Sequence, residues 1–158
     1  QRGGHMIEQV TFEKTTYAKP PARFEAGTSP ISGVIGLGMA CDFIKSLDMQ
    51  TVLEYEVSLG KYLDEGLRAF SGVKVLGPKE NKAPITSFVM RGAHAHDIAT
   101  ILGAKGVCVR AGHHCTMPLM AHYGAGATTR VSLMCYNTKA EVDAFFNALY
   151  HVRKVFNG

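Results

Sequence analysis

Two long segments with apolar residues at helical spacing constrain the fold of this chain more than any other feature of its sequence. One runs from about residue 50 to 70, and the other follows the T-x-x-E pattern of Thr138 and Glu141, a capping box that opens a helix. The apolar positions of the first are Val52, Leu59, Leu63, Leu67 and Phe70, and those of the second are Val142, Phe145, Phe146, Leu149, Val152 and Phe156. Each stripe needs an apolar surface to cover it, which predicts a layered domain.

Short strand-like segments separated by turn residues lie between these two helices. They are VKVLG (73–77), PITSFVMRG (84–92), VCVR (107–110) and TTRVSLMCYN (128–137), with a short helix expected over 96–106. This order predicts an α+β fold of two layers, in which a small, mostly antiparallel sheet packs on long helices.

A further helix is predicted from Ile31 to about Leu47. Pro30 suits its first position, and Thr28 or Ser29 is expected to cap it. Gly33, Gly36 and Gly38 lower its helix propensity, which makes sense if this face packs closely against another backbone. Residues 1–30 have weak periodicity and are expected to be extended chain and loop.

The composition limits the class of protein. With 46% hydrophobic and 19% charged residues the chain has material for one core, and its net charge of +4 shows no clustered basic stripe of the kind nucleic acid requires. No apolar run is long enough to span a membrane, and no signal peptide is visible. The four cysteines are therefore expected to be free thiols in the cytoplasm or in an organellar stroma or matrix, with Cys41 and Cys135 in the core.

The segment "VCVRAGHHCTMPL" (107–119) concentrates reactive side chains: Arg110, His113, His114 and Cys115. Three interpretations are open from local chemistry. The cluster can be a structural turn, or a zinc site that includes Cys108, although the spacing is poor for zinc. It can also hold a nucleophilic cysteine, because Arg110, imidazolium groups and the helix start expected at "TMPL" would stabilise a thiolate.

The motif "RAGHHCTMPLM", with Arg130 in "TTRVSLMCYNT" fifteen residues after Cys115, resembles the C-terminal part of SufS-like (group II) cysteine desulfurases and selenocysteine lyases of the class V aminotransferase family. "RFEAGTSPISGVIGLG" (23–38) and "GGHMI" (3–7) match the same family in the same order. The resemblance covers essentially the whole chain. It implies a fold-type I pyridoxal-phosphate enzyme that acts as a homodimer on L-cysteine or L-selenocysteine.

The resemblance also implies roles for individual residues. Cys115 would accept sulfur as a persulfide, and Arg130 would clamp the substrate carboxylate, with Arg110 lining the same pocket. Gly27 and Thr28 would reach the cofactor phosphate of the partner subunit, and the helix behind them would favour that anion. His113 and His114 match the motif, but no role is assigned to them. No metal is expected.

Parts that this family needs are not found in the sequence. No lysine stands in the Ser-Gly-His-Lys setting of the family's Schiff base. We therefore expect the chain to be the C-terminal portion of a longer enzyme, inactive alone, with residues 1–30 as the tail of the cofactor domain and a dimer contact, and 31–158 as the small domain. The resemblance also implies a small sulfur-acceptor protein for iron–sulfur cluster assembly. The alternative is a stand-alone sulfur-carrier or zinc-binding domain.

Overall fold

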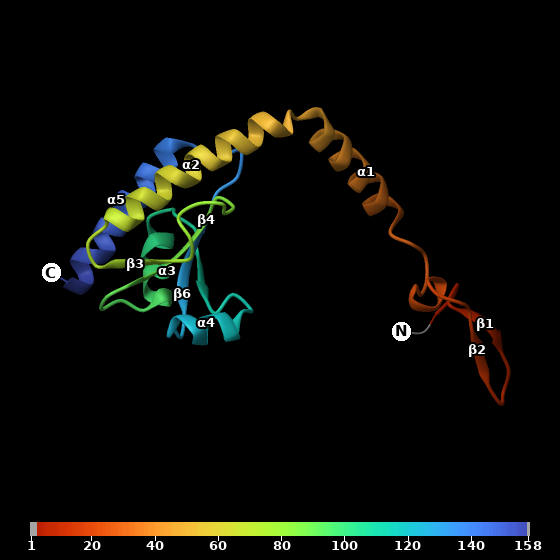
Figure 1. Cartoon of the computed structure of the whole chain (residues 1–158). Helices are drawn as coiled ribbons and strands as arrows, with labels where there is room; N and C mark the ends of the chain where they lie inside the picture. Colours follow the sequence, from red (N-terminus) through yellow and green to blue (C-terminus); the bar gives the residue numbers. More distant parts are fainter. Residues whose placement is uncertain (1–2, 158) are drawn as a thin grey trace. The chain divides into compact units, whose positions relative to one another are not determined.

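The computed structural model describes residues 3–157, which form two compact units (Figure 1). The first unit extends to Asp48, and the second begins at Met49. Each unit is described by itself.

The first unit consists of a hairpin, a short turn of helix and one long helix. Strands β1 (Ile7–Val10) and β2 (Thr15–Tyr17) pair antiparallel, and η1 (Ala22–Phe24) follows. The expectation of extended chain and loop over residues 1–30 therefore missed a small β-hairpin. The hydroxyl of Thr11 closes its turn by accepting bonds from the backbone N–H groups of Glu13 and Lys14, at 3.2 and 3.1 Å.

Helix α1 (Ile31–Ser46) begins as predicted, but its start is built differently. Pro30 is the N-cap and no side chain caps the helix, so the expected capping by Thr28 or Ser29 is wrong. The backbone carbonyl of Ser29, not its hydroxyl, accepts from Ile31 N–H at 2.8 Å. Within the described residues, nothing lies within 4 Å of a Cβ added at Gly36 or Gly38, so the close packing expected around these glycines is not seen.

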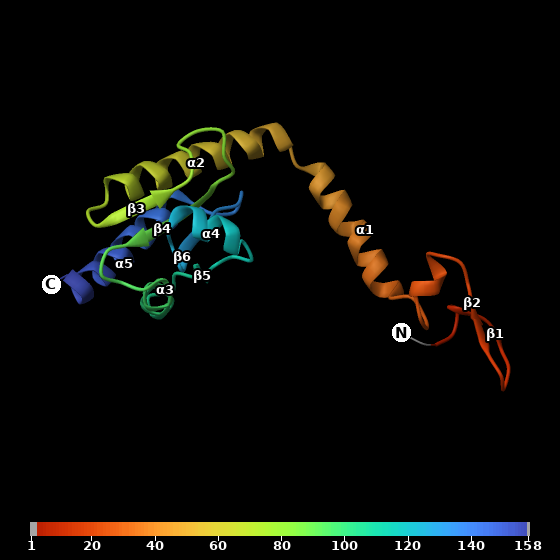
Figure 2. The same cartoon turned by 60° about the horizontal axis from the view of Figure 1, so that its bottom comes forward.

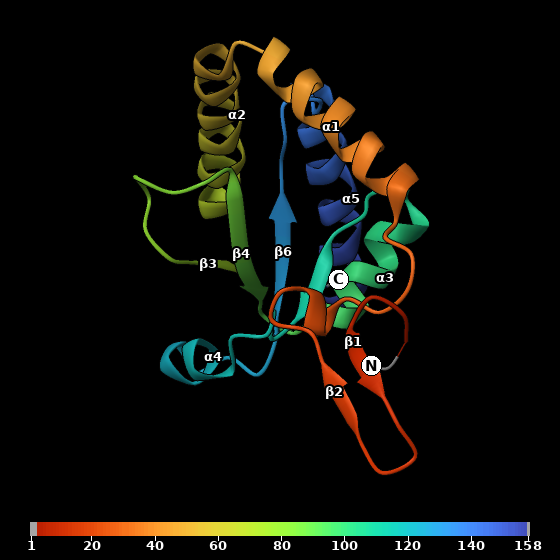
Figure 3. The same cartoon turned by 90° about the vertical axis from the view of Figure 1, so that its right-hand side faces the viewer.

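The second unit contains a sheet of four antiparallel strands in the order β3-β4-β6-β5. They are β3 (Val73–Leu76), β4 (Ile85–Met90), β6 (Thr128–Ser132) and β5 (Arg110–Gly112). Figure 3 shows the neighbouring strands β4 and β6 running in opposite directions. The mostly antiparallel sheet predicted from the sequence is confirmed.

Three helices pack against this sheet and bury its core: α2 (Met49–Ala69), α3 (Ala95–Ala104) and α5 (Lys139–Asn157). Figure 2 shows α2 and α5 side by side along the sheet. The core contains Leu59, Leu63, Leu67, Phe88, Met90, Ile98, Leu102, Val131, Leu133, Val142, Phe145, Ala148, Leu149 and Val152. Members of both predicted stripes are among them, so the two-layer α+β class is confirmed.

Side chains alternate along β4 and β6, which gives the sheet two different faces. Phe88 and Val131 belong to the helix-covered core, whereas Ser87 and Arg130, which pair across the strands, alternate to the other face. The helices thus leave Arg130 on the side of the sheet away from the core.

Two local predictions need correction, and the second of them concerns both units. The third strand was expected at 107–110, but β5 spans Arg110–Gly112 and pairs with β6 only from Thr128 to Arg130. Val107 and Val109 instead pack against the core, and the backbone N–H of Val107 donates to the carbonyl of Leu102 on α3 at 3.0 Å. Cys41 and Cys135 were expected in the core, but both are exposed.

Helix α5 starts with the capping box read from the sequence. Thr138 Oγ1 accepts from Glu141 N–H at 3.3 Å, and the Glu141 carboxylate accepts from Thr138 N–H at 2.7 Å. Among the residues that the structure describes, no helix is both long and apolar enough to cross a membrane.

Candidate functional site

The pairing of β5 with β6 brings together two of the arginines selected from the sequence. Arg110 stands directly opposite Arg130, Ala111 opposite Thr129, and Gly112 opposite Thr128. Opposite residues on one face of an antiparallel pair have Cβ atoms about 5 Å apart. Arg110 and Arg130 therefore carry two positive charges to the same spot on the sheet.

Two like charges opposite each other destabilise a sheet unless an anion lies between them. Arg130 Nε is buried and has no hydrogen-bond partner among the described residues. A guanidinium binds a carboxylate through two parallel hydrogen bonds, so the pair fits the carboxylate of a small substrate. This geometry agrees with the binding role expected for both arginines and does not test it.

Cys115 lies in a tight turn that follows β5. Gly112 has φ +129°, and His114 and Cys115 have φ +55° and +62°, two consecutive non-glycine residues in the left-handed region. His113 closes the turn: its Nδ1 accepts from Cys115 N–H at 3.1 Å, and its carbonyl accepts from Thr116 N–H at 2.9 Å. The side chain of Cys115 is exposed.

His114 points the other way, into the protein. Its Nε2 lies 2.8 Å from the hydroxyl of Thr128, which is fully buried on β6. Burial and the positive charge of Arg130 lower the pKa of His114 below its usual value, although its contact with Thr128 raises it. The sequence analysis counted imidazolium groups among the stabilisers of a thiolate, whereas the lowered pKa of His114 disfavours the charged form of this ring.

The helix start expected at "TMPL" is present. Helix α4 (Met117–Tyr123) follows the turn directly, with Thr116 as N-cap and Gly124, at φ +64°, as C-cap. The order strand, turn, helix around Cys115 was therefore correct. Its strand is only three residues long, however, and begins at Arg110.

Gly27 and Thr28 lie in the first unit, just before α1. Gly27 has φ +81° and nothing within 4 Å of an added Cβ, so its backbone leaves open space beside it. Its N–H donates to Gly4 O at 2.9 Å, which leaves the exposed Thr28 as the polar group at this position. An open glycine beside an exposed hydroxyl fits the approach of a phosphate group. These two residues and Cys115 belong to separate units.

The described residues contain no group of three or more His, Cys, Asp or Glu side chains arranged to hold a metal ion. The zinc alternative for Cys108, His113, His114 and Cys115 therefore has no structural support.

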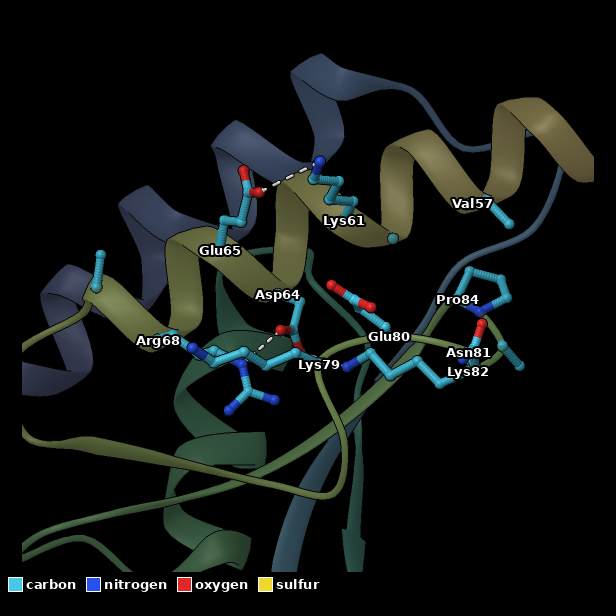
Figure 4. A pocket seen from close by; sticks show the side chains of 13 residues that line it. Val57, Lys61, Asp64, Glu65, Arg68, Lys79, Glu80, Asn81, Lys82 and Pro84 are labelled. Atoms are coloured by element: carbon cyan, nitrogen blue, oxygen red, sulfur yellow. Dashed lines mark hydrogen bonds and ion pairs between the residues drawn. The ribbon is translucent and has the colours of Figure 1, made fainter.

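A pocket of about 760 Å³ lies elsewhere in the second unit, between α2 and the β3–β4 loop (Figure 4). At its wall the buried Asp64 forms an ion pair with Arg68 at 2.6 Å and another with Lys82. Arg68 also donates to the carbonyls of Gly77 and Pro78, at 3.3 and 3.2 Å. None of the site residues selected from the sequence lines this pocket, and its charged groups hold the loop in place.

A family model described as aminotransferase class-V matches residues 1–145, which is most of the chain. The chain belongs to the aminotransferase class-V family. This confirms the class proposed from the R-x-G-H-H-C motif, while the narrower SufS-like group is not separately tested.

Proteins similar to this chain are named as cysteine desulfurases. The chain is 44% identical over 153 residues to a probable cysteine desulfurase of Xylella fastidiosa, and 42% identical over 154 residues to a cysteine desulfurase of Serratia proteamaculans. These matches cover 97% of the chain in both cases, but 37% and 38% of the relatives. The chain thus spans little more than a third of the length of these relatives.

Solved structures agree. The chain is similar to a cysteine desulfurase from Escherichia coli with a TM-score of 0.84 at 31% identity, over 99% of this chain and 39% of that one. It is also similar to a cysteine desulfurase from Thermococcus onnurineus, with a TM-score of 0.82 at 36% identity, over 98% of this chain and 39% of that one. The fold is therefore that of part of a cysteine desulfurase.

One contact at the candidate site was missed in the sequence. Thr128 was seen only as the start of a strand, yet its hydroxyl holds His114. The signal was indirect: once Arg110 is paired with Arg130, Gly112 falls opposite Thr128 and the turn that follows must pass close to it.

Proposed function

We propose that this chain is the C-terminal portion of a pyridoxal-phosphate-dependent cysteine desulfurase, in which Cys115 accepts sulfur from L-cysteine. The names of the similar proteins and the small share of their length that the chain covers support this proposal. The alternatives of a stand-alone sulfur carrier or a zinc-binding domain gain nothing from the described residues.

The observation that carries the proposal is the register of the β5–β6 pair. It sets two guanidinium groups opposite each other on one strand pair, and the exposed thiol of Cys115 follows at the end of β5. Arg130 and Arg110 would hold the carboxylate of the substrate, so that its sulfur lies toward the turn. A cationic clamp beside an exposed thiol suits an amino acid whose own sulfur is transferred.

The reaction at Cys115 is a sulfur transfer. The thiolate forms an S–S bond with the sulfur of L-cysteine, while the carbon–sulfur bond of the substrate breaks. The electron pair of that bond stays on the carbon, which takes up a proton and becomes the methyl group of L-alanine. Cys115 is left as a persulfide.

Pyridoxal phosphate, when bound, supplies the electron sink that makes this carbon–sulfur bond breakable. From this chain, Gly27 and Thr28 would contact its phosphate: the glycine allows close approach and Thr28 offers a hydroxyl. By family resemblance that phosphate belongs to the partner subunit of a homodimer, and the lysine that binds the cofactor lies outside this chain.

The same mechanism accepts L-selenocysteine, so selenocysteine lyase activity is part of the proposal.

After the reaction with L-cysteine, the persulfide on Cys115 must be removed by another thiol. The exposure of Cys115 suits a small acceptor protein that carries sulfur toward iron–sulfur cluster assembly.

Persulfide mapping on the full-length gene product tests the proposal. The protein is incubated with pyridoxal phosphate and L-cysteine, and its cysteine peptides are analysed by mass spectrometry without reducing agent. We expect one added sulfur atom on Cys115 and alanine release, because Cys115 lies in the turn that follows the strand of Arg110. Replacing Cys115 with Ala should lower alanine release by about a hundredfold or more, as expected for loss of a nucleophile.

The chain offers a matched control. Cys135 is also exposed, so Cys135→Ala should leave both the persulfide on Cys115 and the rate of alanine release unchanged. An unmodified Cys115 in a protein that binds the cofactor and releases alanine would refute the proposed role.

A further inference from the structure

We propose that His114 is a positioning residue for Cys115: its imidazole, held by the hydroxyl of Thr128, fixes the left-handed turn that presents the thiol. The inference rests on the proposed function, because it gives His114 a part in delivering the Cys115 thiol to the substrate. It assigns a role to a residue of the motif that resemblance alone left without one.

The backbone of the turn is the first reason. His114 and Cys115 both have positive φ, at +55° and +62°. Histidine adopts this region more readily than most residues, whereas cysteine has no such preference. Consecutive residues in such conformations persist only where their surroundings hold them. The turn at Cys115 therefore needs an anchor.

The second reason is that only one of the hydrogen bonds described for this turn joins it to the sheet. The bonds from Cys115 and Thr116 to His113 close the turn on itself but do not attach it to the sheet. The 2.8 Å contact of His114 Nε2 with Thr128 Oγ1 does attach it, across fourteen positions of sequence. Within the described residues His114 Nδ1 has no partner, so the hydrogen bonding of this ring goes through Thr128.

The third reason is the position of Thr128. It is fully buried on β6, opposite Gly112 and two residues before Arg130. One strand therefore carries both the arginine proposed to bind the substrate carboxylate and the hydroxyl that holds the turn of the thiol. The bond fixes the distance between the two ends of the site.

The charge state of His114 agrees with this role. Its neighbours Arg130, Arg110 and His113 are basic, and the pKa of His114 is lowered, first by burial and then by the charge of Arg130. A neutral ring keeps one nitrogen as donor and one as acceptor. The lowered pKa favours this neutral form, which adds no charge to the arginine pair.

Three variants of the full-length gene product, loaded with pyridoxal phosphate, test the inference. Thr128→Val removes the hydroxyl and keeps the shape, and Thr128→Ser keeps the hydroxyl. His114→Asn keeps a residue that tolerates positive φ but is too short to reach Thr128. The measurements are backbone hydrogen exchange over residues 112–117, the single-turnover rate of persulfide formation on Cys115, and KM for L-cysteine.

We expect Thr128→Val and His114→Asn to exchange faster in this segment alone and to form persulfide about tenfold more slowly, because small misplacements of a reacting group are costly. KM should stay within about twofold, since both arginines are intact. Thr128→Ser should match the unaltered protein, which a purely space-filling role of Thr128 would not predict.

The inference is overturned if Thr128→Val behaves like the unaltered protein, or if Thr128→Ser is as slow as Thr128→Val. It is also overturned if faster exchange spreads along the whole of β6. If the unaltered protein forms no persulfide on Cys115, the proposed function fails. The hydrogen exchange of Thr128→Val and Thr128→Ser then decides by itself whether the anchoring contact exists.

Discussion

Asp64 is a single buried carboxylate whose partners come from three parts of the second unit. Arg68 on α2 and Lys82 in the β3–β4 loop form ion pairs with it, and Thr86 on β4 lies 3.5 Å away. Burial raises the pKa of Asp64, but the hydrogen bonds from Arg68 and Lys82 outweigh this and lower it overall. The folded state therefore favours the ionised carboxylate of Asp64.

Replacing Asp64 with Asn should destabilise the chain at neutral pH. Arg68 and Lys82 would lose their counterion in a partly buried setting, and breaking such a pair costs about 3 kcal/mol. Because the folded pKa of Asp64 is lowered, its contribution is complete above the unfolded value of 3.8 and is lost as pH falls toward the folded value. The difference between the unaltered chain and Asp64→Asn, measured by urea unfolding, should therefore shrink in acid.

The neighbouring residue provides the control for this pH dependence. Glu65 pairs with Lys61 at 3.9 Å with both side chains largely exposed, and such pairs contribute little. Glu65→Gln should leave the urea unfolding curve unchanged both at neutral pH and in acid. An Asp64→Asn variant as stable as the unaltered chain at neutral pH would show that the network is not stabilising.

At the scale of elements, the sequence predicted a helix correctly where it carries a strong pattern for one. The apolar stripes of α2 and α5 and the capping box of Thr138 and Glu141 predicted those helices well. Strand β5 begins three residues later than predicted: the apolar Val107 and Val109 suggest a strand, but the register with β6 includes only Arg110 to Gly112. The contact of His114 with Thr128 depends on that register as well, so local pattern could not reveal it.

The packing of α2 on α5 gives a prediction at this scale. A Cβ added at Gly66 would lie 2.3 Å from Cζ of Phe146, a ring that packs against the core and lies 5.3 Å from Phe145. Alanine gains about 1 kcal/mol in helix propensity, but overpacking costs about 1–3 kcal/mol. Gly66→Ala should therefore lower the free energy of unfolding by about 1 kcal/mol in a denaturant titration.

Gly103 on α3 is the matched control for this substitution. Nothing lies within 4 Å of its added Cβ, so Gly103→Ala should leave stability equal or raise it by up to about 1 kcal/mol. If Gly66→Ala is stabilising as well, the ring of Phe146 moves aside freely and the α2–α5 contact is looser than the structure indicates.

At the scale of the whole molecule, the two units differ in how they bury apolar residues. The second has a continuous core between sheet and helices. The first has a long helix whose large apolar side chains are all more than half exposed: Ile31, Val34, Ile35, Leu37, Met39, Phe43 and Ile44. A helix that is apolar on all sides is normally buried in a native protein. The chain spans little more than a third of the length of its relatives. In the longer enzyme that we propose, the rest of the protein would cover the apolar side chains of α1.

The same exposure predicts how the 158-residue chain behaves by itself. Exposed apolar surface of this extent promotes association, so we expect the chain to self-associate with increasing concentration in sedimentation experiments. Replacing both Ile35 and Phe43 with Lys should shift it toward monomer, because these side chains are about two-thirds exposed on α1. Val155→Lys, at an exposed apolar position on α5, adds charge without touching α1 and should leave association unchanged. A chain that stays monomeric without any substitution would mean that α1 is covered within the chain itself, and the argument for a missing covering surface would fail.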